Sequence, residues 1–545
     1  MQFDYVIVGA GSAGCVLASR LSENNQNQVL LIEAGDDISS DLALSIPLGV
    51  GKLLNNKQNL WADITKPSGG TLQRKIDWIS GKCIGGSSAI NGMIFVRGHP
   101  IRYDDWVTLG CNGWSYKDCL PYFKKLEDCQ FSSSNLRHRG GPIGAALAEK
   151  DEISELFIKA CIENGYPRVI DYNADIPDGV GYLQLSSKNG KRVSSAKGYL
   201  DNISHRKNLT ILKNAQVNKI LFSGNQAIGV SYIKNNQIYE ALADKEVILC
   251  AGAIRSPKLL ELSGVGNPKI LNNYSIPMVF ENAFVGENLQ DHFMTRICYE
   301  TSSKDTVNYM MGNKFSLGMQ LLNYLVFKKG IFSTTTLKST AYLRSNESEA
   351  IPNLRIQVSL MSAEGRIPES GKSGLDLAGI RASLDPGSAF HIGVYGIYPD
   401  SSGYSHINSL DINSPSNIQP NYLDTARDQK TVIEGLQLIR KLAESPALKN
   451  IITKEIRPTK KVSSNDDLLN FAKETGHTCW HPIGTCKMGL EKNSVVDTNC
   501  KVFGTTKLRV VDGSVLPMHI SSNTNIPILM LAEKISESIA QANQK

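Results

Sequence analysis

The chain has 545 residues, of which 41% are apolar and 20% are charged, and its formal net charge at pH 7 is +6. A chain of this length is expected to form more than one domain. Its basic residues are scattered and no apolar run approaches the roughly 20 residues of a membrane span, which argues against nucleic-acid binding and against a membrane-spanning segment.

The first predicted strand begins close to Met1, which leaves no room for a leader peptide. The expected location is therefore the cytoplasm, with peripheral contact at the inner membrane left open. The eleven cysteines show no CxxC pair and no zinc-ligand spacing, so we expect free thiols in a reducing compartment and no metal site.

Residues 3–35 predict a strand, a glycine-rich turn, a helix and a second strand in that order. The apolar run 5–8 is typical of a buried strand, and the turn 9–14 reads GAGSAG. The run 29–32 predicts the second strand, which ends at Glu33. This order is typical of a dinucleotide-binding unit, and the alternative is a plain βαβ unit with a glycine-rich turn.

Each of the three glycines in this turn has its own physical reason. Gly9 permits the tight turn, Gly11 lets the backbone approach a pyrophosphate, and Gly14 lets the helix pack close to the sheet. Glu33 is placed to accept hydrogen bonds from a ribose, and its charge would repel a 2′-phosphate.

Residues 81–93 form a run of small residues just after Trp78. We expect this backbone to lie against a flat or anionic ligand with its N–H groups turned towards it, rather than to form a flexible linker. Further along, the patterns predict helices at 116–126, 151–165 and 431–444 and antiparallel strands over 209–239. They also predict a buried strand at 246–251, followed by a helix that begins near Ile254 with Pro257 in its first turn. A large antiparallel sheet is expected within 299–465. Residues 362–389 are a long loop, either a lid or a surface insertion.

Three spaced stretches now resemble one family. Residues 81–93 read GKCIGGSSAINGM, residues 252–266 read GAIRSPKLLELSGVG, and residues 480–489 read WHPIGTCKMG. With the N-terminal turn and VGENLQDH at 285–292, the chain resembles the glucose–methanol–choline (GMC) family of flavin alcohol oxidoreductases. Within that family it looks most like the bacterial choline-dehydrogenase-like FAD alcohol dehydrogenases.

The resemblance implies FAD and an α/β fold (α+β overall) in which a discontinuous Rossmann-like FAD-binding domain joins a substrate domain built on a large antiparallel sheet with helices. The predicted FAD-binding domain comprises 1–155, 190–298 and 466–545, and the predicted substrate domain comprises 156–189 and 299–465. The implied cofactor-binding residues are Gly9, Gly11, Ser12, Ala13, Gly14, Glu33, Ala34, Gly81, Gly85, Gly86, Ser87, Asn91, Gly92, Met93, Val217, Ala251, Gly252, Asp512, Gly513, Asn523 and Pro527.

Some family members attach FAD covalently through a histidine in the 81–93 segment. Ile90 takes that position here and has no nucleophilic nitrogen, so the resemblance predicts non-covalent FAD. His99, nine residues further on, is interpreted as structural.

Oxidation of an alcohol by hydride transfer needs a base for the hydroxyl proton, and histidine is well matched to that task near neutral pH. By resemblance His481 is the catalytic histidine, and Asn523 takes the second active-site position, where its amide would hold the substrate oxygen. Asn525 is the alternative if the register slips by two residues. His477 is interpreted as structural.

The expected partner is a small-molecule primary alcohol, which would be oxidised to the aldehyde. Lys338 stands where choline-type relatives carry a glutamate, which disfavours the cationic alcohol choline; alternatively Lys338 points to solvent. The sequence leaves open the electron acceptor (a quinone, a carrier protein or O2) and the oligomeric state. The rival function is a flavin-containing lyase of the same fold, similar to hydroxynitrile lyase.

Overall fold

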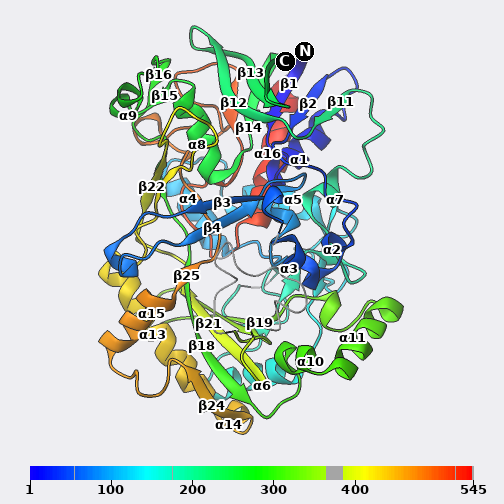
Figure 1. Ribbon diagram of the computed structural model, residues 1–545, viewed down its shortest axis with the longest axis vertical. Coiled ribbons are helices and arrows are strands. Elements are labelled where there is room, and N and C mark those ends of the chain that lie inside the picture. Colours follow the sequence, from blue (N-terminus) through cyan, green and yellow to red (C-terminus); the bar gives the residue numbers. More distant parts are fainter. Residues whose placement is uncertain (55, 175, 364–383, 522, 543–545) are drawn as a thin grey trace.

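The computed structural model describes residues 1–54, 56–174, 176–363, 384–521 and 523–542. Two seven-stranded sheets dominate it, one in the upper half and one in the lower half of Figure 1. The strand order of the first sheet is β11 (Leu209–Leu212), β2 (Val29–Ile32), β1 (Gln2–Val8), β14 (Gln237–Leu249), β13 (Gln226–Lys234) and β12 (Gln216–Ser223), with β26 (Leu508–Val510) also paired to β14.

The first sheet combines parallel strand pairs with antiparallel pairs at one side. β11, β2, β1, β14 and β26 pair in parallel, whereas β12, β13 and β14 form antiparallel pairs. All four residues of β2 are buried, as expected for a strand covered on both faces. The turns that contain Gly224 and Asn235-Asn236 lie between β12 and β13 and between β13 and β14.

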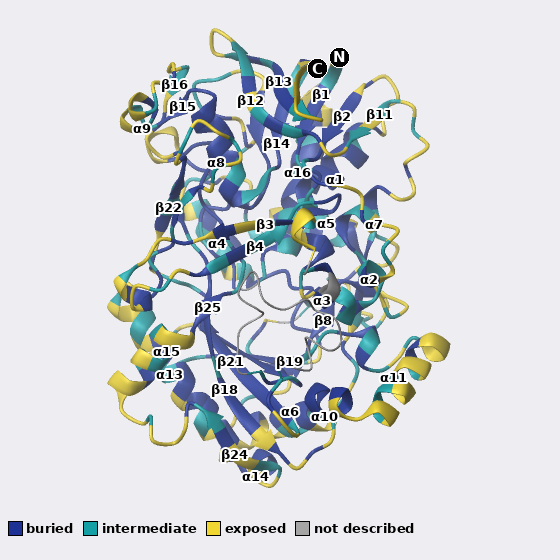
Figure 2. Cartoon of the chain, viewed as in Figure 1, coloured by how far each residue is buried: buried dark blue, intermediate teal, exposed yellow. Residues whose placement is uncertain are grey.

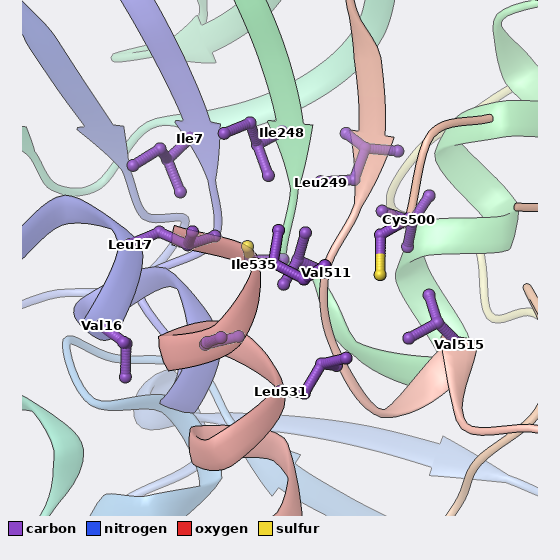
Figure 3. Close-up of a cluster of buried hydrophobic side chains, with 14 of the residues drawn as sticks. Ile7, Val16, Leu17, Ile248, Leu249, Cys500, Val511, Val515, Leu531 and Ile535 are labelled. Atoms are coloured by element: carbon purple, nitrogen blue, oxygen red, sulfur yellow. The ribbon is translucent and has the colours of Figure 1, made fainter. Parts of the chain in front are cut away.

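Helices from the two ends of the chain cover one face of this sheet. α1 (Ser12–Leu21) packs against α16 (Asn525–Ala542), which also contacts α5 (Tyr116–Leu126). Figure 3 shows Ile535 of α16 beside Leu17 of α1 and Val511, with Leu531 further along α16. Each such buried aliphatic side chain stabilises the fold by about 1.5–3 kcal/mol. The C-terminal helix therefore completes the core that the N-terminal βαβ unit begins.

The second sheet is antiparallel throughout its paired strands. Its order is β24 (Ile452–Arg457), β18 (Phe293–Thr301), β21 (Ala389–Gly396), β20 (Leu354–Ser359), β19 (Leu337–Leu343) and β7 (Gly179–Tyr182), with β25 (His477–Thr478) paired to β18. The helices around it are α6 (Glu152–Glu163), α10 (Val307–Gly312), α11 (Lys314–Phe327), α13 (Ala426–Ala443), α14 (Pro446–Lys449) and α15 (Asn465–Thr475). Figure 2 shows the strands of both sheets largely buried.

Smaller elements fill the space between and around the sheets. They are α2 (Leu42–Ser45), α3 (Val50–Leu53), α4 (Pro100–Thr108), α7 (Ser195–Tyr199), α8 (Gly252–Leu262) and α9 (Pro268–Asn273), with the strands β3 (Leu60–Ile64), β4 (Asp77–Gly81), β5 (Glu127–Cys129), β6 (Ile143–Leu147), β8 (Gln184–Leu185), β9 (Ser187–Lys188), β10 (Lys191–Arg192), β15 (Val265–Gly266), β16 (Phe280–Glu281), β17 (Glu287–Leu289), β22 (Gly403–His406) and β23 (Asn417–Gln419). Among the described residues, no helix combines the length and apolar character needed to cross a membrane.

The predicted fold class is confirmed, because a Rossmann-like unit and a large antiparallel sheet are both present. The predicted domain boundaries stay a prediction; the one after residue 155 falls within α6 and the one after residue 298 falls within β18. Most of the predicted loop 362–389 lies outside the described residues.

Two sequence-based expectations about elements were wrong. β11 pairs with β2 in parallel, so the 209–239 region is not antiparallel throughout. α8 begins at Gly252, which places Pro257 in its second turn rather than its first. Proline lacks the N–H that would bond to the carbonyl of Ala253. The Thr485 hydroxyl donates to that carbonyl instead, at 2.6 Å.

Candidate active site

A cavity of about 230 Å³ opens at the carboxyl ends of the parallel strands β1, β2 and β14. In open α/β sheets this edge is where ligands bind. The predicted cofactor residues on its wall are Gly9, Gly11, Ser12, Ala13, Glu33, Ala34, Gly81, Gly86, Ser87, Val217, Ala251, Gly252, Asp512 and Gly513. Residues far apart in the sequence therefore meet at one site.

The glycines of the N-terminal turn divide into closely packed and open positions. A Cβ atom on Gly9 would lie 2.6 Å from the carbonyl oxygen of Cys250, and one on Gly14 would lie 1.9 Å from that of Gly9. A Cβ on Gly11 would meet nothing closer than 3.9 Å. Gly11 is also the N-cap of α1, whose first turn carries no acidic residue. The start of α1 is thus open to an anion such as a pyrophosphate.

Glu33 reaches the cavity from the end of β2. Its Oε2 accepts a hydrogen bond from the Ala10 N–H at 2.8 Å, and its Oε1 accepts one from the Gly35 N–H at 2.9 Å. Burial raises the pKa of this carboxyl group above its usual value. Each carboxylate oxygen can accept a second hydrogen bond, so Glu33 fits the predicted role of binding ribose hydroxyls.

The 81–93 segment lies directly against the turn of the N-terminal unit. The Gly85 N–H donates to the carbonyl of Ala10 at 2.7 Å, and a Cβ on Gly86 would lie 2.7 Å from the Cα of Gly11. Ile90, the residue at the position of covalent attachment in some relatives, is buried in a small apolar cluster. The two small-residue segments predicted to face FAD are therefore packed together.

Some predicted cofactor residues lie around the cavity rather than on its wall. Within the described part of the chain, the wall does not include Gly14, Gly85, Asn91, Gly92, Met93, Asn523 or Pro527. Asn91 accepts hydrogen bonds from the Met93 N–H and from Arg192, both at 3.0 Å. Asn91 and the unpredicted Arg192 thus shape the backbone of this segment.

Asp512 ties two parts of the site together, the start of α8 and the turn 513–515. Its carboxylate accepts hydrogen bonds from the Gly252 N–H and the Ser514 N–H, both at 2.8 Å, and from the Ser256 hydroxyl. This fixes the start of α8 against the turn that leads to Gly513. A buried carboxylate on the cavity wall thus holds these two segments together.

His481 lies between Trp480 and Pro482, both of which line the cavity. Its backbone N–H donates to Oδ1 of the buried Asp291 at 2.7 Å. Asp291 also accepts hydrogen bonds from the hydroxyls of Tyr422 and Thr478. The histidine is thus positioned by a buried carboxylate, and burial raises the pKa of that carboxylate to about 6.

The hydrogen bonds around His481 determine which of its nitrogens carries the proton. His292 Nε2 is 3.1 Å from the carbonyl oxygen of Ile397, so that nitrogen is the donor. Burial lowers the pKa of His292 to about 3, so its Nδ1 is an acceptor. His481 Nδ1 lies 3.0 Å from this acceptor and must donate to it. The lone pair of His481 is consequently on Nε2.

Asn523 meets that lone pair. Its Nδ2 is 2.7 Å from His481 Nε2, and its Oδ1 accepts a hydrogen bond from Arg355. Asn525, the alternative for this position, instead accepts a hydrogen bond from the Ser12 hydroxyl at 2.6 Å. The geometry thus brings Asn523 to the histidine and Asn525 to the start of α1.

Arg355 is a fully buried cation beside this pair. It lies on β20 and donates to Thr340 Oγ1 at 3.0 Å and to the Tyr395 hydroxyl at 2.9 Å. Burial, with the neighbouring His292 and the Arg355 charge, holds the pKa of His481 well below its usual range. His481 is therefore neutral at neutral pH and available as a base.

Lys338 does not point to solvent, so that alternative is wrong. It is buried in β19, and burial lowers the pKa of its ammonium group, while the charges of Asp151, Glu149 and Asp305 act to raise it.

The two histidines interpreted as structural, His99 and His477, have local partners. His99 caps α4, and His477 bonds to the Thr478 carbonyl.

Sequence reasoning did not assign roles to Arg355, Asp291 and His292. Residues 354–360 read LRIQVSL, and the polar residue at every second position was a signal that one face of this strand is polar. Asp291 and His292 stand in the 285–292 stretch that carried the family resemblance, but their contact with His481 is made across the fold.

Known proteins match this chain along nearly its whole length. The sequence model of the GMC oxidoreductase family matches residues 3–294 with its N-terminal part and residues 399–532 with its C-terminal part. Oxygen-dependent choline dehydrogenase 1 of Chromohalobacter salexigens is 36% identical over 99% of this chain and 95% of its own length. The choline dehydrogenase of Photobacterium profundum is 34% identical, covering 98% and 93%. The structure of pyridoxine 4-oxidase from Mesorbium loti superposes with a TM-score of 0.87 at 28% identity, covering 99% of both chains.

Proposed function

The chain belongs to the GMC oxidoreductase family, and we propose that it oxidises a primary alcohol to the aldehyde with His481 as the base. The family consists of FAD-dependent flavoproteins that act on alcohol-type substrates. When bound, FAD supplies the hydride acceptor. The observation that supports the proposal most is the Nε2 lone pair of a neutral histidine held beside the cavity wall.

The proposed reaction assigns one task to each residue. A substrate hydroxyl that replaces the direct 2.7 Å contact between His481 Nε2 and Asn523 Nδ2 would donate its proton to His481 Nε2 and accept a hydrogen bond from Asn523 Nδ2. Because Arg355 donates to Asn523 Oδ1, the amide is turned with its NH₂ group towards the histidine. Removing the hydroxyl proton leaves an alkoxide, which is a better hydride donor than the alcohol. The nearby Arg355 charge would stabilise the developing negative oxygen.

The same charge bears on the choice of substrate. A buried cation next to Asn523 disfavours an alcohol that carries its own positive charge, such as choline. Lys338 is also buried, but its charged neighbours are Asp151, Glu149 and Asp305, so the effect on substrate choice rests on Arg355. We therefore propose neutral aliphatic or aromatic primary alcohols, or anionic ones, as substrates, although the relatives named above are choline dehydrogenases.

We further propose that FAD is held without a covalent bond. The buried Ile90 offers no nitrogen for attachment, and the cradle around Gly11 and Gly252 is formed by backbone. Heat denaturation should release all of the flavin into the supernatant. Flavin that stays with the precipitated protein would contradict non-covalent binding.

The test of the function is an anaerobic visible spectrum of the purified holoenzyme during titration with neutral, anionic and cationic primary alcohols, choline included. We expect the flavin band to bleach with a neutral or anionic alcohol, and the bleaching to be lost in His481→Ala but retained in His205→Ala, a matched control at an exposed histidine. Admitting air then separates an oxidase from a dehydrogenase by the rate of reoxidation.

Two results would overturn the proposal. A bound flavin that none of the alcohols bleaches would favour the lyase alternative, which keeps the base but needs no net oxidation. Bleaching that survives in His481→Ala would show that another group is the base.

A further inference from the structure

α11 presents its apolar side chains to solvent. It is a 14-residue helix with the sequence KFSLGMQLLNYLVF. Its large apolar side chains are between 45% and 80% exposed at Phe315, Met319, Leu321, Leu322, Leu325, Val326 and Phe327. Figure 2 shows the helix largely in the exposed colour at the edge of the molecule. A surface helix of a globular protein normally has the opposite arrangement.

The inner side of α11 is already occupied. Tyr324 is its buried residue, and Gln320 accepts a hydrogen bond from the Ile331 N–H at 3.3 Å. The helix packs against α10 and against the 3₁₀ turn Ile331–Ser333. Leu317, which packs against the core of the second sheet, also lies on this inner side. Among the described residues, the exposed apolar side chains of α11 are therefore separate from its inward contacts.

Basic residues stand at both ends of this face. Lys314 begins the helix, and Lys328 and Lys329 follow its last turn. Residues 306–346 contain no aspartate or glutamate. Glu149, from another part of the chain, is engaged by the Gly330 N–H at 2.9 Å. The surface is therefore apolar in its centre and positively charged at its ends.

The length of α11 decides how such a surface could meet a bilayer. At 1.5 Å per residue the helix is about 21 Å long, which is less than the roughly 30 Å hydrocarbon core. A helix with this composition lies in the interface, with its apolar side chains among the acyl chains and its lysines among anionic headgroups.

We propose that α11 docks the protein on an anionic phospholipid bilayer. None of the seven outward apolar side chains carries a hydrogen-bonding group, whereas protein interfaces combine apolar contacts with polar and aromatic-polar ones. The lysines at both ends complement anionic lipid, and the stretch free of acidic residues avoids repulsion from it. The inference does not depend on the proposed reaction, since it rests on a surface separate from the His481 site.

The test is co-sedimentation of the flavin-loaded protein with lipid vesicles. Vesicles of phosphatidylcholine alone are compared with vesicles that also contain phosphatidylglycerol, at low and at high salt. We expect binding to the anionic vesicles that weakens with salt, and at least about a tenfold loss of binding in the double variant Leu322→Gln/Leu325→Gln. Lys314→Gln/Lys329→Gln should weaken binding at low salt only.

Leu410→Gln is the matched control, because Leu410 is 63% exposed while Leu322 and Leu325 are 54% and 59% exposed. It should bind vesicles like the unaltered protein. Flavin content and thermal midpoint confirm that each variant is folded.

Three outcomes would overturn the proposal. The first is equal sedimentation with and without phosphatidylglycerol. The second is binding that the α11 variants leave unchanged. The third is an absence of vesicle binding together with a dimer, seen by light scattering, that Leu322→Gln/Leu325→Gln dissociates; that result would assign the face to a second copy of the chain.

Discussion

The Nδ1 atoms of His292 and His481 lie 3.0 Å apart, and the carbonyl of Ile397 determines that His481 is the donor of this pair. Because an acceptor on His292 holds the proton on His481 Nδ1, the reactive lone pair is kept on Nε2, next to Asn523. Selection of the tautomer thus begins at a backbone carbonyl in the loop after β21.

We expect His292→Leu to lower kcat by about 10- to 100-fold while FAD remains bound, because His481 loses the acceptor that fixes its tautomer. His391→Leu is the matched control: His391 is also buried and lies on β21, burial lowers its pKa to about 3 as well, and its Nδ1 faces the Met361 carbonyl. The control should lose stability without losing kcat per bound flavin. Equal losses of kcat in the two variants would show that His292 has only a packing role.

Asn523 and Asn525 should have separable effects. Asn523→Ala removes the amide that meets His481, so we expect kcat to fall by about 100-fold with FAD affinity retained. Asn525→Ala removes the acceptor of the Ser12 hydroxyl at the start of α1, so FAD affinity should fall instead. Steady-state kinetics and flavin titration on both variants check this, and a reversed pattern would assign the catalytic role to Asn525.

The predicted cofactor residues that line the cavity come from local motifs in the sequence. The backbone geometry at Gly9, Gly11 and Gly14 follows from which conformations and approaches only glycine allows. The ends of β2 at Ile32 and of β14 at Leu249 follow from apolar runs that stop abruptly. Since parallel strands end at one edge of a sheet, residues distant in sequence could be assigned to a common site.

The electrostatics of the site could not be predicted in the same way. Arg355 reaches Asn523 because β20 pairs with β19 and β21, and pairing between distant strands leaves no local signal. The same holds for the contact between His292 and His481. The exposure of α11 also could not be predicted, because an apolar run in the sequence does not indicate which of its side chains face water.

The acid limb of kcat/KM should depend on Arg355. Its positive charge helps to hold the pKa of His481 below the usual 6.5, so the base stays unprotonated until the pH falls well below that value. Kinetics of the unaltered enzyme should therefore show an acid limb below pH 6.5. In Arg355→Met the charge is lost, the pKa of His481 rises, and the limb should move to higher pH.

Arg355→Lys controls for the charge, because it keeps a cation but not the bonding geometry. Both variants should lose kcat, since Asn523 is no longer held in place, but only Arg355→Met should shift the limb. A limb that stays in place in both would mean that the Arg355 charge does not act on His481.

Gly11→Ala is a substitution that should leave the FAD-free protein folded but should weaken the binding of FAD. A Cβ there would be 3.9 Å from its nearest neighbour, and its backbone φ of −75° suits alanine. We expect Gly11→Ala apoprotein to keep its thermal midpoint but to bind FAD at least about tenfold more weakly, because the methyl group occupies the approach of the pyrophosphate to the start of α1. Gly69→Ala, at an exposed glycine that also has open space, is the control and should bind FAD normally. Flavin fluorescence during titration of the apoproteins measures the affinity, and equal affinity in the two variants would place the pyrophosphate elsewhere.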